Sequence, residues 1–443
     1  MKKLDPINDN IISLVIKFML PSVIGMIGLS LCIFLDTMFI GRGIGNDGLA
    51  ALNISIPVYN IFSATGLIFG VGGATALAIN IGRKKYNVLN EIFTTSIVLA
   101  LLVGIIFSVF GSFYLNKIAI ILGSSNELLP LVMDYLKVIL FSSIIYILSN
   151  CLNVFVRNDH DPKVAMWAII VTNIINIVLD YIFIFNLNMG MKGASLATTI
   201  GQLFGVFVLL THFLKKSCRI KFNIKNLSYK YIKRIITNGF ASFILEISGG
   251  IVILMFNMRL LSIGGDIAVS AYSIIANVAL IFIAIFSGIS QGIQPLLGTN
   301  YGANKMDRVL SIYKIGTKIS FSLGIIFFVI GILEPQVLVS IFSSSKDELM
   351  EVAKVGIMIY FIAFIPAGVN IINIGFLQAI EKSRFSIFLS LMRGLILIFI
   401  ILNIFSNIFG LNGVWMTIPI VESLVVIIST LLVRYVENKV IVS

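Results

Sequence analysis

The sequence is organised around a stretch that occurs twice, as GVGGATALAINIGRKKYN at residues 70–87 and as SQGIQPLLGTNYGANKMD at residues 290–307. Glycine, asparagine and lysine positions coincide at a constant offset of 220 residues, and the pairs are Gly72 with Gly292, Asn80 with Asn300, Gly82 with Gly302 and Lys85 with Lys305. The preceding loops also match, as IGNDGLAAL from Ile44 and IGGDIAVSAY from Ile263. Self-similarity at a fixed offset indicates an internal repeat, so we expect two structurally equivalent halves.

The composition identifies the class of protein. Of the 443 residues, 58% are hydrophobic and only 12% are charged, whereas soluble globular chains carry about 25% charged residues. Long apolar stretches predict membrane-spanning helices. Twelve are present, at residues 11–40, 52–82, 92–122, 131–156, 163–187, 193–214, 232–262, 269–300, 311–341, 349–378, 385–408 and 413–435. The sequence therefore predicts an all-α polytopic membrane protein.

Lysine and arginine are unevenly divided between the two sets of connecting segments. If the N-terminus is cytoplasmic, the cytoplasmic segments carry 22 Lys and Arg residues and the external segments carry six, which are Arg42, Lys117, Lys192, Arg259, Lys346 and Lys354. Because basic loops remain on the cytoplasmic side, both termini are expected inside the cell. The net charge of +12 is thus explained by membrane topology, without a nucleic-acid partner. The expected location is the inner (plasma) membrane.

A basic segment divides the chain into six plus six helices. Residues 215–234 contain no apolar run long enough to span a membrane, and we interpret them as a cytoplasmic linker between an N-terminal lobe, residues 1–214, and a C-terminal lobe, residues 235–443. Because each lobe has an even number of helices, both have the same orientation in the bilayer. The lobes are predicted to be parallel repeats related by a pseudo-two-fold axis along the membrane normal, as in many secondary transporters.

Two aspartates lie inside apolar stretches, where an ionisable residue is a functional candidate. Asp36, in FLDTMFIGR at residues 34–42, and Asp180 lie five and six residues before the outer ends of their helices, and Thr198 lies six residues into the next helix. At about 1.5 Å per residue, all three lie roughly 7–9 Å from the outer helix ends. Asn176 precedes Asp180 by four residues, on the same helix face. A short connection joins the fifth and sixth helices, so Asp180 and Thr198 are expected to face each other.

Five stretches, taken in order, resemble the multidrug and toxic compound extrusion (MATE) family, and most closely its MepA-like bacterial branch. They are FLDTMFIGRGIGNDGLAALNISIPV from Phe34, RNDHDPKVAM from Arg157, NIVLDYIFIF from Asn176, GASLATTIGQ from Gly193 and QPLLGTNYGA from Gln294. The resemblance covers essentially the whole chain. It implies a twelve-helix, two-lobed exporter with a central cavity, which antiports organic, often cationic, compounds against Na⁺ or H⁺. It also implies a cation-coupling site in the N-terminal lobe, formed by the positions Asp36, Asn176, Asp180 and Thr198.

The chemistry of these four residues fits either coupling ion. Two carboxylates, an amide and a hydroxyl provide the oxygen ligands that a hard cation such as Na⁺ prefers. Two neighbouring carboxyl groups in a medium of low dielectric can equally load and release a proton. The sequence leaves both ions open.

The acidic cluster is absent from the second half. At the repeat offset, Asp36 corresponds to Met255 or Phe256, Asp180 to Ile400 and Thr198 to Ile418. A polar pair that the fold itself required would be expected in both halves. The asymmetry therefore favours a coupling role for the first-half cluster.

The second half has two acids of its own. Glu246 lies about twelve residues beyond Arg234, and Glu422 lies about ten residues beyond Asn412, which places both near the membrane midplane. Either can hold a cationic substrate in the cavity, or can serve only as a hydrogen-bonded glutamate between helices. Glu246 also resembles an acidic position in the seventh helix of some members of the family.

We therefore expect a secondary-active multidrug exporter and not an enzyme, because no HExxH or Walker A motif is present. The expected partners are small organic, cationic substrates and the lipid bilayer, with no nucleic acid, no cofactor besides the coupling ion, and a monomeric state. One alternative is a lipid-linked saccharide flippase of the same superfamily, and a membrane-embedded enzyme is a weaker one. A flippase requires a more basic cavity, whereas Lys17, Lys137, Lys318 and Arg393 are expected mostly near helix ends.

Overall fold

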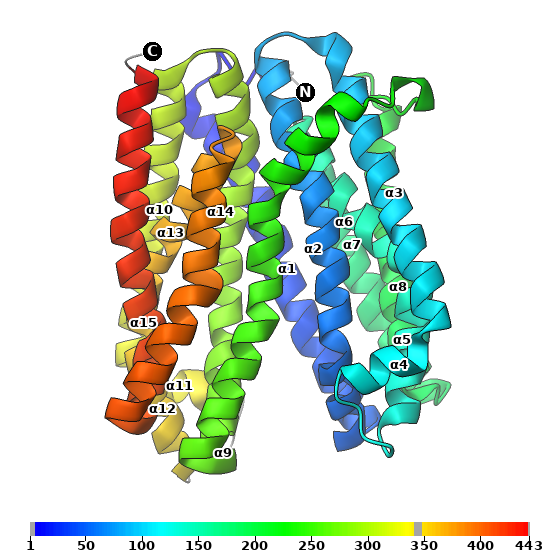
Figure 1. Ribbon diagram of the computed structural model, residues 1–443, viewed down its shortest axis with the longest axis vertical. Coiled ribbons are helices and arrows are strands. Elements are labelled where there is room, and N and C mark those ends of the chain that lie inside the picture. The colour runs from blue at the N-terminus through cyan, green and yellow to red at the C-terminus, as the bar shows by residue number, and fades with distance from the viewer. Residues whose placement is uncertain (1–4, 341–347, 442–443) are drawn as a thin grey trace.

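The protein is a bundle of long helices with both termini at one end, which we call the terminal end (Figure 1). The computed structural model describes residues 5–340 and 348–441, and these residues contain no β-strand. The first half comprises α1 (Ile11–Gly43), α2 (Asn46–Gly82), α3 (Leu89–Phe113), α4 (Leu115–Ile121), α5 (Leu129–Phe141), α6 (Ser143–Asn158), α7 (Pro162–Asp180) and α8 (Gly190–Leu210). The second half comprises α9 (Ile232–Gly302), α10 (Met306–Leu333), α11 (Pro335–Ser340), α12 (Glu348–Tyr360), α13 (Phe364–Ala379), α14 (Ser383–Leu391) and α15 (Leu397–Ile441).

Two of these helices are too long to cross a bilayer once. The 71 residues of α9 would extend about 107 Å at 1.5 Å per residue, against a hydrocarbon core of about 30 Å. Each of the two contains a glycine in the left-handed region, Gly265 in α9 and Gly410 in α15, where the chain turns back at the end opposite the termini (Figure 1). Glycine is required there because other residues carry a Cβ that disfavours this conformation.

The predicted number of spans agrees with the structure. Within the described residues, nine helical segments are long and apolar enough to cross a membrane, and α5 and α6 form a further pair bent by 54°. Dividing α9 at Gly265 and α15 at Gly410, and counting the bent pair as one span, gives twelve.

The internal repeat is visible in the backbone. Three pairs of residues with positive φ are separated by the repeat offset, and they are Gly45 with Gly265, Gly190 with Gly410, and Lys84 with Asn304. The fourth span of each half is interrupted at an equivalent place, at Ser142 between α5 and α6 and at Phe361–Ala363 between α12 and α13. The two halves therefore share local irregularities as well as helix order, which supports parallel repeats.

Each half has its own hydrophobic core, but two helix ends are exchanged between them. Leu14, Val15 and Phe18 of α1 pack in the core formed otherwise by residues 256–436. Conversely, Ile235 at the start of α9 packs in the core of the first half. Both exchanged ends lie toward the terminal end, so α1 contacts the second half there and the first half, through α7, further along.

Several predicted boundaries differ from the structure. The predicted helix 92–122 ends at Phe113, and a separate short helix, α4, follows it. Arg393 does not lie near a helix end: it lies in a π-helical turn, Met392–Ile396, ten residues into the span that begins with α14. Lys2, Lys3, Lys346 and the last residue of the predicted helix 311–341 lie outside the described residues.

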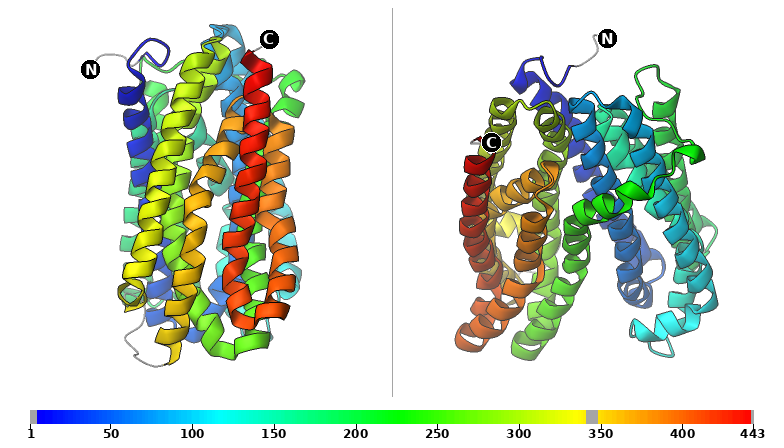
Figure 2. Two further views of the ribbon diagram at one scale, coloured as in Figure 1. Left: turned by 90° about the vertical axis from the view of Figure 1, so that its left-hand side faces the viewer. Right: turned by 45° about the horizontal axis from the view of Figure 1, so that its top comes forward.

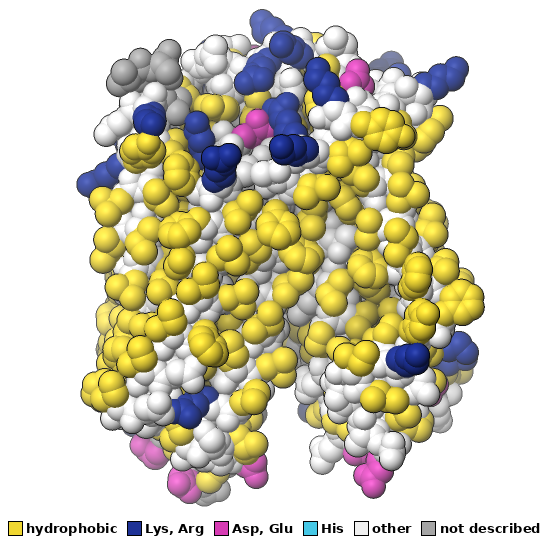
Figure 3. Space-filling model, viewed as in Figure 1, with side chains coloured by type: hydrophobic (Ala, Val, Ile, Leu, Met, Phe, Trp, Pro, Cys, Tyr) yellow, Lys and Arg dark blue, Asp and Glu magenta, His cyan; other side chains and the backbone are white. Residues whose placement is uncertain are grey.

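The surface has the polarity of a membrane protein. Apolar side chains cover the middle of the face drawn in Figure 3, and lysine and arginine gather at the terminal end. At the opposite end the same face is hollowed between the two halves (Figure 3). Figure 2 shows the halves converging toward the terminal end and diverging away from it.

The basic segment 215–234 is attached to the first half. Its backbone N–H groups donate to side chains of α3, from Lys221 to Asn90 Oδ1 at 2.7 Å and from Ser228 to Thr95 Oγ1 at 3.1 Å. Arg219 N donates to Asp159 Oδ2, in the turn between α6 and α7, at 2.9 Å. The segment therefore leads into α9 from a fixed position on the first half.

Candidate cation-coupling site

The structure brings the four predicted site residues together between α1, α7 and α8. Asn176 is central, because its Nδ2 donates to Asp180 Oδ2 at 2.9 Å and to Thr198 Oγ1 at 3.4 Å. The carboxyl groups of Asp36 and Asp180 lie within hydrogen-bonding reach of each other. The predicted facing of α7 and α8 is thus observed, and α1 contributes the second carboxylate.

Two buried oxygen atoms at this site have no protein donor. Asp36 Oδ1 and Asp180 Oδ1 are both buried and accept no hydrogen bond from the described residues. Buried carboxylate oxygens are normally paired, because an unpaired one loses its hydration without compensation. Two such atoms on adjacent carboxyl groups suit a cation or a shared proton. Asp180 is fully buried, whereas Asp36 and Thr198 are half-buried.

A local irregularity follows Asp180 directly. The α-helical part of the span ends at Asp180, and a π-helical turn, Tyr181–Asn186, continues it. Turns of this kind occur mostly as single insertions and frequently at functional sites. This turn could not be predicted from the sequence, because nothing in YIFIFN distinguishes it from an ordinary apolar helix.

Cys32 is an additional neighbour that the sequence analysis missed. It lies one helical turn before Asp36, and its Sγ donates to Asn176 Oδ1 at 3.0 Å. The hydrogen bond fixes the amide of Asn176, so that its nitrogen points toward Asp180 and Thr198. A spacing of four residues between Cys32 and Asp36 was the available sequence signal.

Glu246 lies across the space between the two halves. Its carboxyl group on α9 lies within hydrogen-bonding reach of the Ser63 hydroxyl on α2. Tyr59, one turn away on α2, lies within electrostatic range of Glu246, Cys32 and Asp36. Glu246 is therefore separate from the four-residue site but faces the same inter-half region.

Glu422 has a different environment. Its Oε1 accepts from Arg393 Nε at 2.8 Å, and its Oε2 accepts from Asn370 Nδ2 at 2.7 Å. The Asn370 side chain continues the network, because its Oδ1 accepts from Ser429 Oγ at 2.9 Å. Glu422 is buried and its charge is neutralised by Arg393, which lies in the second π-helical turn. This partner could not be predicted from the sequence, since the two residues are on different spans.

A third polar cluster lies near the terminal end of the first half. His212 is held between two aspartates, with Nε2 at 2.9 Å from Asp159 Oδ2 and Nδ1 at 3.0 Å from Asp161 Oδ2. Ligand atoms of Asp159, His212 and Cys218 lie within 4.8 Å of one another. Because both ring nitrogens of His212 bond to carboxylates, neither has a lone pair free for a metal. The geometry is that of a protonated imidazole in an ion-pair network.

Comparison with known proteins gives the family. A family model described as MatE matches residues 21–182 and 239–405, one segment in each half. The chain belongs to the MatE family. The resemblance seen in the sequence is thereby confirmed, and so is the all-α fold class. The two matched segments contain Asp36, Asn176 and Asp180 in the first half and Glu246 in the second, whereas Thr198 and Glu422 lie outside them.

Relatives within the MatE family are transporters by name. The chain is 28% identical to the multidrug export protein MepA of Staphylococcus aureus strain MSSA476, over 95% of this chain and 93% of the relative. It is 26% identical to MepA of Staphylococcus haemolyticus strain JCSC1435, over 97% of this chain and 95% of the relative. A solved structure described as the outward-facing conformation of a multidrug resistance MATE family transporter has a TM-score of 0.92 and 22% identity, and each chain covers 99% of the other.

Proposed function

We propose that this MatE-family protein is a secondary-active exporter of small organic, often cationic, compounds. Support comes from family membership, from full-length relatives named as multidrug export proteins, and from a buried polar site of the kind that ion coupling requires. The observation that carries the proposal is the pair of unpartnered oxygens, Asp36 Oδ1 and Asp180 Oδ1. A structural polar pair would satisfy both atoms within the protein.

The orientation follows from charge. On the face drawn in Figure 3, lysine and arginine gather at the terminal end, so we place this end in the cytoplasm and place the protein in the plasma membrane. The hollow between the halves then opens to the outside. Residues 1–214 and 235–443 act as the two lobes, and the segment 215–234 joins them on the cytoplasmic side.

The first helix connects the cation site to the contact between the lobes. Asp36 lies on the outer part of α1, which packs against α7, while Leu14 and Phe18 lie on the inner part, which packs in the core of the second half. A cation held by Asp36 and Asp180 would stabilise the packing of outer α1 against α7. An ion that prefers one arrangement of α1 shifts the lobes toward the state with that arrangement. Release of the ion would favour the other state.

The coupling ion is Na⁺ or H⁺, and one experiment separates them. Purified protein in proteoliposomes is given an outward-to-inward Na⁺ gradient at constant pH, and then a pH gradient without Na⁺. Export of a fluorescent cation driven only by the first gradient identifies Na⁺, and export driven only by the second identifies H⁺.

The residues are tested in cells with a cationic dye. Asp36→Asn and Asp180→Asn should each abolish dye efflux while the protein remains expressed. Asp266→Asn is the matched control, since this exposed aspartate lies at the turn between the two spans of α9. Efflux that persists in both site variants would refute the coupling mechanism. Absence of dye efflux by the wild type would refute the exporter and favour a flippase.

Glu246 is the proposed acid for a cationic substrate. It faces the space between the lobes. Its named neighbour is the neutral hydroxyl of Ser63, which does not compensate the charge of a carboxylate. The charge of Glu422 is already compensated by Arg393. Of the two acids, Glu246 therefore attracts a substrate cation more strongly. Glu422 is proposed to contribute less to substrate binding.

A further inference from the structure

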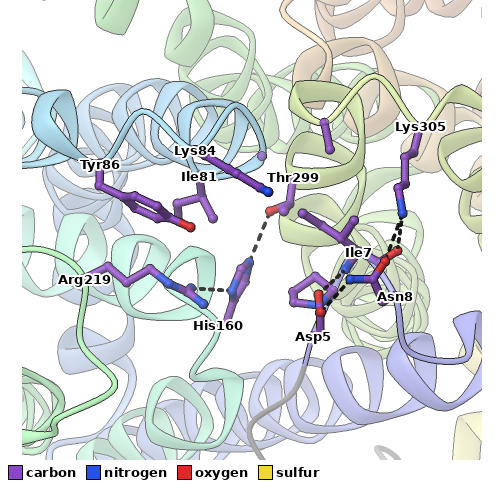
Figure 4. Close-up of a pocket in the computed structure, with 13 residues that line it drawn as sticks. Asp5, Ile7, Asn8, Ile81, Lys84, Tyr86, His160, Arg219, Thr299 and Lys305 are labelled. Carbon is purple, nitrogen blue, oxygen red and sulfur yellow. Dashed lines mark hydrogen bonds between the residues drawn. The ribbon is translucent and has the colours of Figure 1, made fainter.

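A second cavity lies at the terminal end, at the meeting point of the two halves (Figure 4). It has a volume of about 680 Å³ and is walled by Ile81 and Gly82 of α2, by Thr299 of α9 and by the segment Asp5–Asn8 that leads into α1. It is separate from the hollow at the opposite end and from the Asp36 site. Nothing in the proposed export mechanism uses it.

The wall of this cavity is basic. Three cationic side chains line it, Lys84, Arg219 and Lys305, against a single acid, Asp5. Both carboxylate oxygens of Asp5 accept hydrogen bonds within its own segment. Oδ1 accepts from Ile7 N at 3.0 Å, and Oδ2 accepts from Asn8 Nδ2 at 2.8 Å. The hydrogen bond from the Asn8 side chain is the main reason that the pKa of Asp5 lies below its ordinary value of 3.8. Asp5 therefore neutralises one charge and leaves a positive excess.

Of the three cations, Lys84 has the fewest protein partners for its positive charge. It lies two residues beyond Gly82, the last residue of α2, with a φ of 58°, and it lines the cavity. Figure 4 shows its ammonium group pointing toward Thr299. Within the described part of the chain, the Lys84 side chain forms no hydrogen bond and no ion pair. By contrast, Lys305 donates to Asn8 Oδ1 at 3.0 Å, and Arg219 lies 3.7 Å from Asp159 Oδ1.

Neutral donors complete the wall. His160 Nε2 lies 3.1 Å from Thr299 Oγ1, a contact that joins the first half to the second. Arg219 NH1 lies 2.6 Å from His160 Nδ1, so this nitrogen accepts and Nε2 carries the proton. The hydroxyl of Tyr86 also points into the space (Figure 4). Guanidinium, ammonium and hydroxyl donors arranged around one space are the usual partners of a phosphate group.

We propose that this cavity binds a phosphate-bearing anion, either a free phosphate compound or the headgroup of an anionic phospholipid. Lys84 and Arg219 come from the first half and Lys305 from the second. The anion therefore contacts both halves only when their terminal ends are together. A ligand of this kind stabilises the state in which the terminal end is closed. The proposal goes beyond export itself and requires neither a particular substrate nor a particular coupling ion.

The first experiment measures binding to the purified protein in detergent. Thermal unfolding is followed with increasing inorganic phosphate, against chloride at the same ionic strength. A bound anion should raise the unfolding midpoint in a saturable manner. Lys84→Gln should weaken the apparent affinity about tenfold or more, because a charge-assisted hydrogen bond is lost. Lys85→Gln is the matched control, since this neighbouring lysine has the same charge and does not line the cavity.

The second experiment identifies the source of the phosphate group. The same titration is made with sn-glycerol 3-phosphate in detergent, and the unfolding midpoint is then compared in nanodiscs of phosphatidylglycerol and of phosphatidylcholine. If the unfolding midpoint rises in a saturable manner with the soluble compounds, the cavity binds a free phosphate ligand. A Lys84-dependent stabilisation by phosphatidylglycerol alone assigns it to a lipid headgroup. Stabilisation by none of these, or an equal response in Lys84→Gln and Lys85→Gln, overturns the proposal.

Discussion

Gly82 and Gly302 bring the ends of α2 and α9 into backbone contact across the pseudo-two-fold axis. A Cβ at Gly82 would overlap the carbonyl oxygen of Thr299, and a Cβ at Gly302 would overlap that of Ile79. The two contacts are equivalent under the repeat offset, since Ile79 corresponds to Thr299. Backbone atoms cannot move aside as a flexible side chain does, so closure of the terminal end depends on both glycines.

Gly82→Ala should therefore hold the terminal ends apart. The expected cost is about 1–3 kcal/mol of overpacking, with a lower thermal unfolding midpoint and reduced dye efflux. Gly249→Ala is the control, because a Cβ at this helical position in α9 meets no atom within 4 Å. The control reports the effect of a Gly→Ala substitution in a helix where no such contact is made. Equal unfolding midpoints in the two variants would contradict the role assigned to Gly82.

Arg308 should fasten the start of the first helix to the second half. Its guanidinium donates to Asp9 O at 2.8 Å, to Pro6 O at 3.2 Å and to Asn300 Oδ1 at 3.0 Å. Arg308→Gln is expected to lower the free energy of unfolding by about 1–3 kcal/mol and to increase protease cleavage near residue 9. Arg384→Gln, at an exposed arginine of the same end of the bundle, should change neither. Unchanged cleavage in Arg308→Gln would exclude this anchoring.

The stability of the protein should depend on the buried Arg393 and Glu422 being present together or absent together. Removal of the cation in Arg393→Met leaves a buried, uncompensated carboxylate and is expected to destabilise the protein by about 3–5 kcal/mol. The double variant Arg393→Met, Glu422→Leu should recover most of this loss, since no buried charge remains. Thermal unfolding in detergent measures both. A double variant no more stable than the single one would show that the loss is due to packing.

Asp161 should give the protein a pH-dependent contribution to stability. Burial alone would raise its pKa, but hydrogen bonds from His212 and Lys215 outweigh burial and hold the pKa below the ordinary value of 3.8. A depressed carboxyl pKa stabilises the folded state above the unfolded pKa, and this contribution is lost as pH falls through the folded pKa. Asp159 and Arg219 are the other charged groups beside His212 and remain in place.

The test compares Lys215→Gln with the wild type across pH. Because Lys215 is 43% exposed, its ion pair is expected to contribute less than about 1 kcal/mol. The stability difference should be present near neutral pH and should decrease as the pH falls below about 4 and through the folded pKa of Asp161. Lys216→Gln, at the adjacent exposed lysine, is the control. A difference that does not change with pH would show that Lys215 acts through packing.

Much of the candidate cation site was predictable from the sequence because its residues are local outliers. Asp36 and Asp180 are carboxylates in apolar helices, and the short α7–α8 connection placed Thr198 opposite Asp180. The spacing of four residues placed Asn176 on the same face. Cys32 was missed because a cysteine is common in an apolar helix, and its spacing of four residues from Asp36 was the only sequence signal.

Other features depended on contacts between residues far apart in the chain. Arg393 was expected near a helix end, but a π-helical turn directs it to Glu422 on another span. The cavity at Lys84 was not predictable, because its wall joins three separate segments, including the one before α1. Sequence patterns indicate the environment of a residue but not its distant partner.

The sequence by itself determined the membrane class, the twelve spans, the repeat and the polar residues of the first half. These properties follow from hydropathy and spacing, which are local and which the bilayer enforces on each helix separately. Only the tertiary structure decided the exchange of helix ends between the halves, the pairing of Glu422 and the basic cavity at the terminal end. These depend on how whole helices pack, and close packing is set by shape complementarity between segments that no local pattern encodes.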